Sequence, residues 1–135
     1  MNSAFELHDS TLSGVSESDG SVTVALRPAY LHKSPGRPGT DAGTGWRLDL
    51  DLRFSGASVE GLPVRFPVEI ADGSLRVGGV EHANVVPLPI PAGAPAELVL
   101  ILETSSRLVV RGSAVASEPR REAEYVEEFS GGQGG

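Results

Sequence analysis

The stretch WRLDLDLRF, residues 46–54, decides the fold class of this chain. Its apolar residues alternate one for one with charged residues along the whole segment. A period of two is typical of a β-strand with one buried and one solvated face, whereas on a helix the same apolar residues would spread around the axis. We therefore predict a strand whose buried face consists of Trp46, Leu48, Leu50, Leu52 and Phe54.

Other segments around this strand also favour β-structure. SVTVALR (21–27) alternates in the same way. LVLIL (98–102) is a continuous apolar run, which is typical of a strand buried on both faces. RLVVRGSAV (107–115) follows it, and Gly112 is a position where a bulge would bend that strand.

Turn residues between these runs predict antiparallel hairpins. Asp19-Gly20 and Asp72-Gly73 are dipeptides that are favoured where both turn residues need a positive φ. The segment TSS (104–106) separates LVLIL from RLVV in the same manner. We expect a hairpin at each of these three places.

Residues 119–129 are compatible with two structures. Tyr125 and Phe129 have the spacing of one helical face, and Ser117 would cap such a helix. Alternatively, YVEEF (125–129) forms a final strand with Tyr125 and Phe129 on one face. We favour the strand, because an antiparallel meander tends to close with another strand.

Three segments lack a strand pattern. HKSPGRPGTDAGTG (32–45) holds four Gly and two Pro, and a loop of this length is often functional. VVPLPIPAGAPAE (85–97) holds four Pro, which predicts an edge strand or an extended connection. SGGQGG (130–135) is expected to be a flexible tail that follows a single domain of residues 1–129.

Composition limits the fold further. Leu, Ile, Val and Phe supply 36 of the 135 residues, which is enough to bury a core. The absence of Cys excludes disulfides, thiolate metal sites and a Cys nucleophile. No apolar run approaches the ~20 residues of a membrane helix. We predict an all-β protein, a single antiparallel β-sandwich or flattened barrel of about seven to nine strands with little or no helix.

The charge disfavours two classes of partner. The net charge of −7 is opposite to that of a surface that binds nucleic acid or an anionic membrane. Residues 118–128 contain five Glu and two Arg, whereas residues 20–40 contain three basic residues and no acid. The first residues lack the basic and apolar regions of a secretory signal, so we expect a cytoplasmic protein.

The three histidines suggest one candidate site. No two of them share a strand as they would in a cupin-like metal barrel. If their strands pair, His8, Asp9 and His32 would form a set of two histidines and one carboxylate, which suits a transition metal. We favour a hydrogen-bonded structural role for these side chains and expect no metal or other cofactor.

The basic residues around the predicted 32–45 loop suggest a second site. Arg27, His32, Lys33 and Arg37 flank or occupy this Gly/Pro-rich segment. Cations and free backbone N–H groups there would suit a phosphate, a carboxylate or an acidic partner. The simpler interpretation, which we favour, is a solvated connection. SPGRPG is not a phosphate-binding loop, because it lacks the Gly-Lys-Ser/Thr ending.

The paired carboxylates do not predict an enzyme. Asp49 and Asp51 point to the same side of the 46–54 strand, as the two acids of a glycosidase would. Arg47 and Arg53 flank them, which favours solvated cross-strand ion pairs instead. No Ser lies in a Gly-x-Ser-x-Gly motif. We therefore expect no catalytic residues.

The two ends of the chain resemble a loose group of proteins. FELHDSTLSGV at 5–15, YLHKS with GTGW, and REAEYVEEF at 121–129 are similar to small bacterial all-β proteins with an F-x-L-H-D-[AS]-x-L opening. Some proteins with such openings look like immunity proteins of bacterial toxin systems. The resemblance implies no activity. The positions that match are Phe5, Leu7, His8, Asp9, Leu12 and Phe129.

We predict a non-enzymatic binding or interaction protein of bacterial type. In this hypothesis the 32–45 loop and the acidic C-terminal segment contact a protein partner or a second copy of the chain, and the immunity-type version pairs the acidic face with a basic toxin. The alternative is a protein that binds a small molecule or a metal near His8, Asp9 and His32.

Overall fold

The computed structural model describes residues 1–62 and 64–130, and all of its regular structure is β-strand. The strands form one antiparallel sheet of twelve members that does not close into a barrel. The all-β prediction is confirmed, but there are more strands than the seven to nine expected from the sequence. Their bounds are β1 Asn2–Glu6, β2 Thr11–Ser18, β3 Ser21–Ser34, β4 Gly43–Ser55, β5 Ser58–Glu60, β6 Val68–Val77, β7 Val80–Ala83, β8 Val85–Leu88, β9 Ala96–Leu102, β10 Arg107–Gly112, β11 Ala114–Pro119 and β12 Glu124–Phe129.

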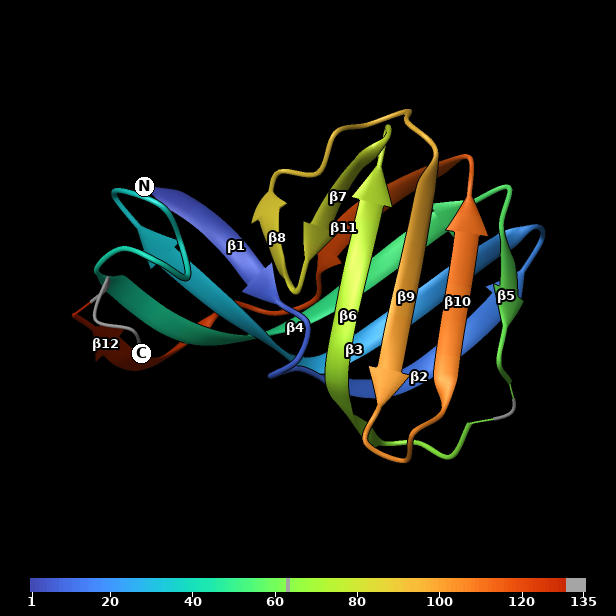
Figure 1. Cartoon of the computed structure of the whole chain (residues 1–135), viewed down its shortest axis with the longest axis horizontal. Coiled ribbons are helices and arrows are strands. Elements are labelled where there is room, and N and C mark those ends of the chain that lie inside the picture. The colour runs from blue at the N-terminus through green and yellow to red at the C-terminus, as the bar shows by residue number, and fades with distance from the viewer. Residues whose placement is uncertain (63, 131–135) are drawn as a thin grey trace.

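The long strands β3 and β4 belong to two halves of the molecule (Figure 1). In one half they pair with β2 and β11, and the sheet continues from β2 through β6, β9 and β10 to β5. In the other half β3 pairs with β1, β1 pairs with β8, and β4 pairs with β12. We call this second half, β8-β1-β3-β4-β12, the curled end. No helix long and apolar enough to cross a membrane occurs in the described residues.

The main core lies between the β2-β3-β4 part of the sheet and the β6-β9-β10 part that folds across it (Figure 1). The predicted strand 46–54 lies inside β4, and its leucines and Phe54 are buried as expected, while Trp46 is half-buried. LVLIL forms most of β9 but is buried on one face only: Leu98, Leu100 and Leu102 face the core, whereas Ile101 is 36% exposed. The prediction that this strand is buried on both faces is therefore wrong for its outer face.

A bulge at Arg27-Pro28 changes which residues of β3 face the core. Before the bulge the side chains that face the core are at even-numbered positions, ending at Leu26, and after it they are at the odd-numbered positions Ala29 and Leu31. Leu26 pairs with Leu50 and Ala29 with Leu48, so two residues of β3 stand opposite one residue of β4. An extra residue of this kind bends the strand and redirects the side chains that follow. As a result Tyr30 and His32 point to the face opposite the main core.

The turn predictions had mixed outcomes. Hairpins at Asp19-Gly20 and at 104–106 are confirmed, and Asp19, Gly20 and Ser105 have positive φ. Asp72-Gly73 is not a turn: it lies within β6 at an irregular point of the β6–β9 pairing, and the hairpin to β7 is made by Gly78-Gly79, both with positive φ. Both Gly78 and Gly79 can adopt this conformation without a side-chain clash.

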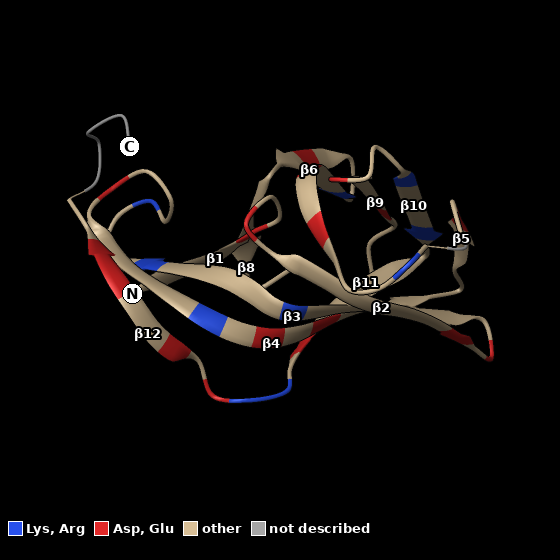
Figure 2. Cartoon of the chain, turned by 90° about the horizontal axis from the view of Figure 1, so that it is seen from below, with Lys and Arg blue, Asp and Glu red and all other residues tan. Residues whose placement is uncertain are grey.

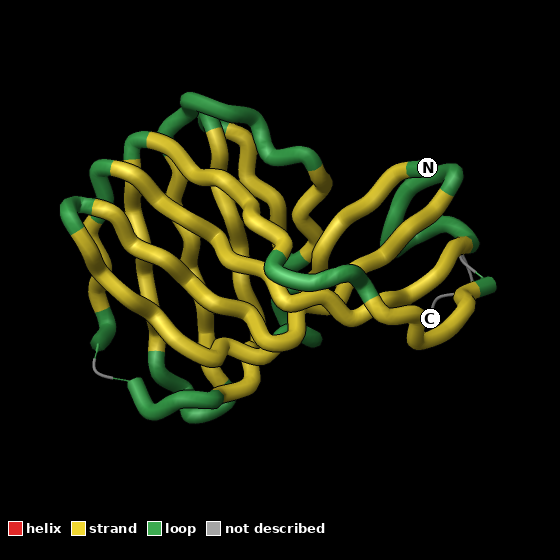
Figure 3. Tube along the Cα trace, turned by 180° about the vertical axis from the view of Figure 1, so that it is seen from behind, coloured by secondary structure: helices red, strands yellow, loops and turns green. Residues whose placement is uncertain are grey.

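Of the remaining predictions for segments outside the strands, some are confirmed and others are wrong. The 32–45 segment is not one long loop, because β3 and β4 remain paired as far as Lys33 and Thr44 and only residues 35–42 lie outside strands. The 85–97 segment is an edge strand, β8, followed by a connection, as predicted. Gly112 ends β10 before the chain passes to β11, with no bulge in its pairing to β9. Figure 3 shows the connections between the strands. The predicted tail lies outside the described residues from 131 onward.

The C-terminal segment is a strand, as favoured from the sequence, but its two aromatic residues lie on opposite faces. The β12–β4 register shifts between Tyr125 and Glu127. Tyr125 consequently packs edge-on against Trp46 with ring centroids 5.5 Å apart. Phe129 lies on the other face, beside His32.

Candidate functional site

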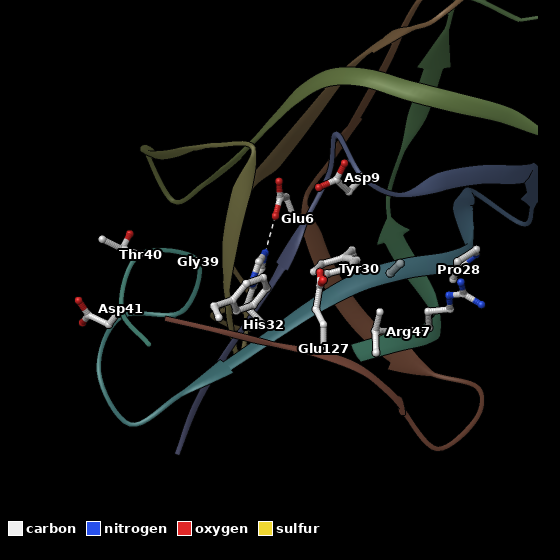
Figure 4. A pocket seen from close by; sticks show the side chains of 13 residues that line it. Glu6, Asp9, Pro28, Tyr30, His32, Gly39, Thr40, Asp41, Arg47 and Glu127 are labelled. Carbon is white, nitrogen blue, oxygen red and sulfur yellow. Dashed lines mark hydrogen bonds and ion pairs between the residues drawn. The ribbon is translucent and has the colours of Figure 1, made fainter. Parts of the chain in front are cut away.

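A pocket of about 1070 Å³ lies on the curled end, on the face opposite the main core. Side chains of β1, β3, β4 and β12 form its floor, and the 35–42 loop forms one wall (Figure 4). Ligand pockets commonly have volumes of ~300–1,000 Å³. The pocket is therefore large enough for a small organic molecule.

Strand register brings the pocket side chains together. Glu6 of β1 pairs with Tyr30 of β3, and His32 of β3 pairs with Gly45 of β4. Gly45 in turn pairs with Glu127 of β12. Directly paired residues of an antiparallel sheet project to the same side. The Arg27-Pro28 bulge and the β12 register shift thus place residues from distant parts of the sequence on one surface.

Gly45 provides the space in which the aromatic side chains meet. A Cβ at this position would collide with the Tyr30 hydroxyl and would lie 3.1 Å from Cζ of Phe129. Tyr30 and Phe129 can therefore close over β4 only because this position has no side chain.

Glu6 is the centre of the polar network on β1. Its side chain is 11% exposed, and its carboxylate contacts His32 Nε2 through Oε2 and His8 Nδ1 at 2.7 Å through Oε1. Asn84 Nδ2 also donates to Oε1 at 3.4 Å. Burial alone would raise the Glu6 pKa, but the hydrogen bond from His32 and the charge of His8 outweigh it and hold the pKa below its ordinary value. Glu6 is therefore a carboxylate at neutral pH.

Asp9 follows β1 and lies beside Glu6. Burial and the neighbouring Glu6 carboxylate raise the Asp9 pKa above its ordinary value, because two nearby negative charges disfavour each other. Ligand atoms of Glu6, His8 and Asp9 lie within 4.8 Å of one another, which is close enough to hold a metal ion. However, Asn84 also contacts His8 Nδ1, so this nitrogen is already paired within the chain.

His32 is the most enclosed polar group of the pocket lining. Its side chain is 8% exposed, and the rings of Tyr30 and Phe129 lie 5.0 Å and 4.9 Å from its own, centroid to centroid. Because Glu6 is ionised, Nε2 is the nitrogen that donates to it, and in the neutral imidazole Nδ1 is then an acceptor. Nδ1 is buried and has no hydrogen-bond partner among the described residues. A buried acceptor without a partner is uncommon and calls for an explanation.

Tyr30 and Glu127 connect β3 with β12 across β4 in the pocket floor. The Tyr30 hydroxyl donates to Glu127 Oε1 at 2.5 Å. Burial, together with this hydrogen bond to a carboxylate, raises the Tyr30 pKa well above its ordinary value. The phenol therefore stays protonated and directs the Glu127 carboxylate across the floor.

The remaining charged groups of the lining are unevenly distributed. Asp41, on the 35–42 loop, accepts the Arg37 backbone N–H through Oδ2 at 2.6 Å. Arg47 is the sole Lys or Arg of the lining and forms no ion pair with a described residue. Figure 4 shows Arg47 at the end of the pocket opposite Asp41. Four carboxylates against one guanidinium give the pocket an acidic lining.

The structure brings together only part of the residues predicted from the sequence. His8 and His32 both contact Glu6, and Asp9 lies beside His8, but the group with ligand atoms within 4.8 Å of one another is Glu6, His8 and Asp9, without His32. His8 Nε2 lies 3.5 Å from Asp9 Oδ2. His8 and His32 come close together because β1 pairs with β3 and not with β2.

The basic residues predicted to form a second site are dispersed. Arg27 binds Asp51 at 2.8 Å, outside the main pocket. Lys33 lies over the Trp46 ring at 4.1 Å, on the other face of the sheet, and Arg37 is exposed on the 35–42 loop. No common cationic site is formed by these three side chains.

The carboxylates of β4 form ion pairs, as expected, but with other partners. Asp51 binds Arg27 and lies 3.6 Å from Arg120, while Asp49 lies 3.3 Å from Arg121. The arginines that flank them in sequence do not take part in these pairs. Both aspartates are thus engaged in a surface network.

The predicted site residues did not include Glu6, Tyr30 or Asn84, and Glu127 was considered as part of the acidic C-terminal segment. Two of these had a readable signal: the apolar positions of 22–31 change from even to odd at Arg27-Pro28, which places Tyr30 on the polar face and Glu6 opposite it once β1 and β3 pair. Asn84 and Glu127 had none, because each reaches the site through a turn or a register shift.

No known protein family, curated protein or solved structure matches this chain.

Proposed function

We propose that the protein is a non-enzymatic binding protein that takes a small organic molecule into the pocket of the curled end. The observation that carries this proposal is the enclosed His32 in a pocket of about 1070 Å³: a buried ring nitrogen lacks a partner within the described chain, and two aromatic rings lie beside the imidazole. A mostly apolar wall with a few convergent polar groups is the usual composition of a ligand site.

The opposite half of the molecule acts as the scaffold in this proposal. We infer that the β2-β3-β4-β11 strands and the β6-β9-β10 strands packed over them function as a β-sandwich, whose apolar core fixes β3 and β4. The same two strands continue into the pocket floor. Sites built on strands of a rigid scaffold are held more accurately than sites on loops.

A neutral solvatochromic dye such as Nile red tests the proposal without assuming the charge of the ligand. We expect saturable binding with a blue-shifted emission. Thr40→Trp, at an exposed position of the pocket wall, should weaken this binding because it fills the pocket. Thr104→Trp, at an exposed position of the β9–β10 turn, is the matched control and should bind as the unchanged protein does. Equal binding by both variants would contradict the proposal.

Interaction with a partner chain is the second candidate function. β12 pairs with β4 alone, so its outer edge carries unpaired backbone groups. Glu124, Glu127 and Glu128 are exposed and form no ion pair with the described part of the chain; Figure 2 shows acidic residues along this strand. The edge suits a second copy of the chain or a basic partner, including a toxin in the immunity-type version.

Sedimentation velocity distinguishes self-association from the monomer. Pairing of two copies through β12 predicts a concentration-dependent dimer that Val126→Pro abolishes, because proline removes a backbone donor from the edge. A monomer at every concentration tested would remove the homodimer and would leave the small-molecule proposal unaffected.

A further inference from the structure

We infer that the ligand of this pocket carries an ammonium group, that is, a protonated primary amine attached to an apolar body. This inference rests on the proposed binding function and adds the chemical class of the ligand. Three features of the lining support it: the excess of carboxylates, the aromatic wall, and the unpaired acceptor on His32.

The carboxylates of the lining are incompletely neutralised within the described chain. Glu127 receives the Tyr30 hydroxyl on one oxygen, and Asp41 receives one backbone N–H. Asp9 has His8 as its nearest basic group, at 3.5 Å. None of these three forms an ion pair with a described Lys or Arg. Carboxylate oxygens with free lone pairs are the partners that an ammonium group requires.

Aromatic rings beside these carboxylates suit the same group. Tyr30 and Phe129 lie with ring centroids 6.4 Å apart and line the pocket on the side where Glu127 projects. The face of such a ring attracts a cation, and its carbon atoms cover the apolar body of the ligand. An anion would gain nothing from these faces and would be repelled by the carboxylates.

His32 adds a requirement for a donor. With Nε2 donating to Glu6, the neutral imidazole leaves the buried Nδ1 as a hydrogen-bond acceptor. A hydroxyl or an ammonium N–H satisfies an acceptor, whereas a carboxylate or phosphate oxygen does not. An ammonium group would therefore satisfy both the His32 acceptor and the carboxylates of the lining.

Arg47 limits where the charged group of the ligand can lie. It is the one guanidinium of the lining, and Figure 4 places it at the end away from Asp41 and Glu6. The ammonium group is therefore assigned to the region bounded by Asp9, Glu127 and His32, and the apolar body extends along Tyr30 and Phe129.

Three probes of equal length test the inference by calorimetric titration at neutral pH in the presence of a chelator: 4-phenylbutylammonium, 4-phenylbutanol and 4-phenylbutyrate. We expect the ammonium probe to bind about tenfold more tightly than the alcohol, and the carboxylate probe more weakly than either. Glu127→Gln and Asp9→Asn should each weaken ammonium binding by about threefold or more and leave alcohol binding unchanged. Glu128→Gln, an adjacent carboxylate outside the lining, is the control and should change neither.

The outcomes separate this inference from the proposed function. Equal affinity for the ammonium and the alcohol probes, or tighter binding of the carboxylate probe, would overturn the ammonium assignment while the pocket remains a binding site. Failure of all three probes and of Nile red to bind would overturn both. Loss of ammonium binding in Glu128→Gln as well would place the cation outside the pocket and would also contradict the assignment.

Discussion

The ring of Phe129 in β12 lies 4.9 Å from the ring of His32 in β3, centroid to centroid, and covers it. Phe129 belongs to the last strand of the chain, and His32 reaches the same face only after the Arg27-Pro28 bulge. The contact therefore depends on both irregularities of the sheet.

Replacing Phe129 with Ala should expose His32. We expect diethylpyrocarbonate to modify His32 several times faster in Phe129→Ala than in the unchanged protein, because the covering ring is lost. The free energy of unfolding should fall by about 0.5–1.5 kcal/mol from the lost ring pair. Mass spectrometry of the modified peptides measures the rate at His32 separately from His8 and His82.

Tyr125→Ala is the matched control for Phe129→Ala. Tyr125 packs on Trp46 on the other face of β12, so its removal should cost a similar free energy of unfolding while His32 remains protected. Similar modification rates at His32 in both variants and the unchanged protein would show that Phe129 does not cover the imidazole.

Glu6 should make stability depend on acid pH. Its pKa in the folded protein lies below the ordinary value of 4.5, so its stabilising contribution is complete above about pH 4.5 and is lost as the pH falls through the folded-state pKa. Glu6→Gln should lower the free energy of unfolding at neutral pH by about 1–3 kcal/mol. Below pH 4.5 the difference from the unchanged protein should shrink.

Urea unfolding at several pH values measures this effect. Glu128→Gln, at an exposed position of β12, is the control and should leave the curve unchanged. A constant difference between Glu6→Gln and the unchanged protein from neutral pH down to pH 3 would contradict the account of Glu6.

The contribution of Asp9 to stability should depend on pH in the opposite direction to that of Glu6. Its folded-state pKa is raised, so its charged form is disfavoured by folding and its contribution to stability declines as the pH rises through that pKa. Asp9→Asn should therefore raise the free energy of unfolding at neutral pH, by less than Glu6→Gln lowers it, because Asp9 is exposed. The same urea series measures it, and a clear loss of stability would contradict the repulsion between Asp9 and Glu6.

The scaffold half predicts a contrast between the two faces of the sheet. Leu50→Ala removes a fully buried side chain and should cost about 2–5 kcal/mol of unfolding free energy. Ile101→Ala, on the outer face of β9, should change it by no more than about 0.5 kcal/mol. A cost at Ile101 comparable to that at Leu50 would indicate that another surface covers β9, which the proposed β-sandwich scaffold does not include.

Much of the fold could be predicted from alternation alone. The strand at 46–54 and the hairpin at Asp19-Gly20 follow from a period-two pattern and turn chemistry, whereas the final strand was favoured only because antiparallel meanders tend to close with a strand. The buried face of LVLIL could not be derived in this way, because a continuous apolar run does not show that one of its faces, with Ile101, is solvated. The Asp72-Gly73 prediction failed because the dipeptide suits an irregular strand position as well as a turn.

The candidate site was less accessible to sequence reasoning. His8 and His32 were recognised because histidines are few, but Glu6 looked like an ordinary polar position of a strand. Glu127 joins the site through a register shift that no local pattern of YVEEF indicates. The site depends on long-range pairing of β1, β3, β4 and β12, which is a property of the whole sheet.

The most direct test of a ligand site in the curled end is an NMR titration of the ¹⁵N-labelled protein with 4-phenylbutylammonium. We expect saturable shifts of four backbone amides, those of Tyr30, His32, Thr40 and Glu127, and no shifts of the amides of β9 and β10. Shifts confined to β9 and β10, or none anywhere at saturating probe, would contradict a binding site in the curled end.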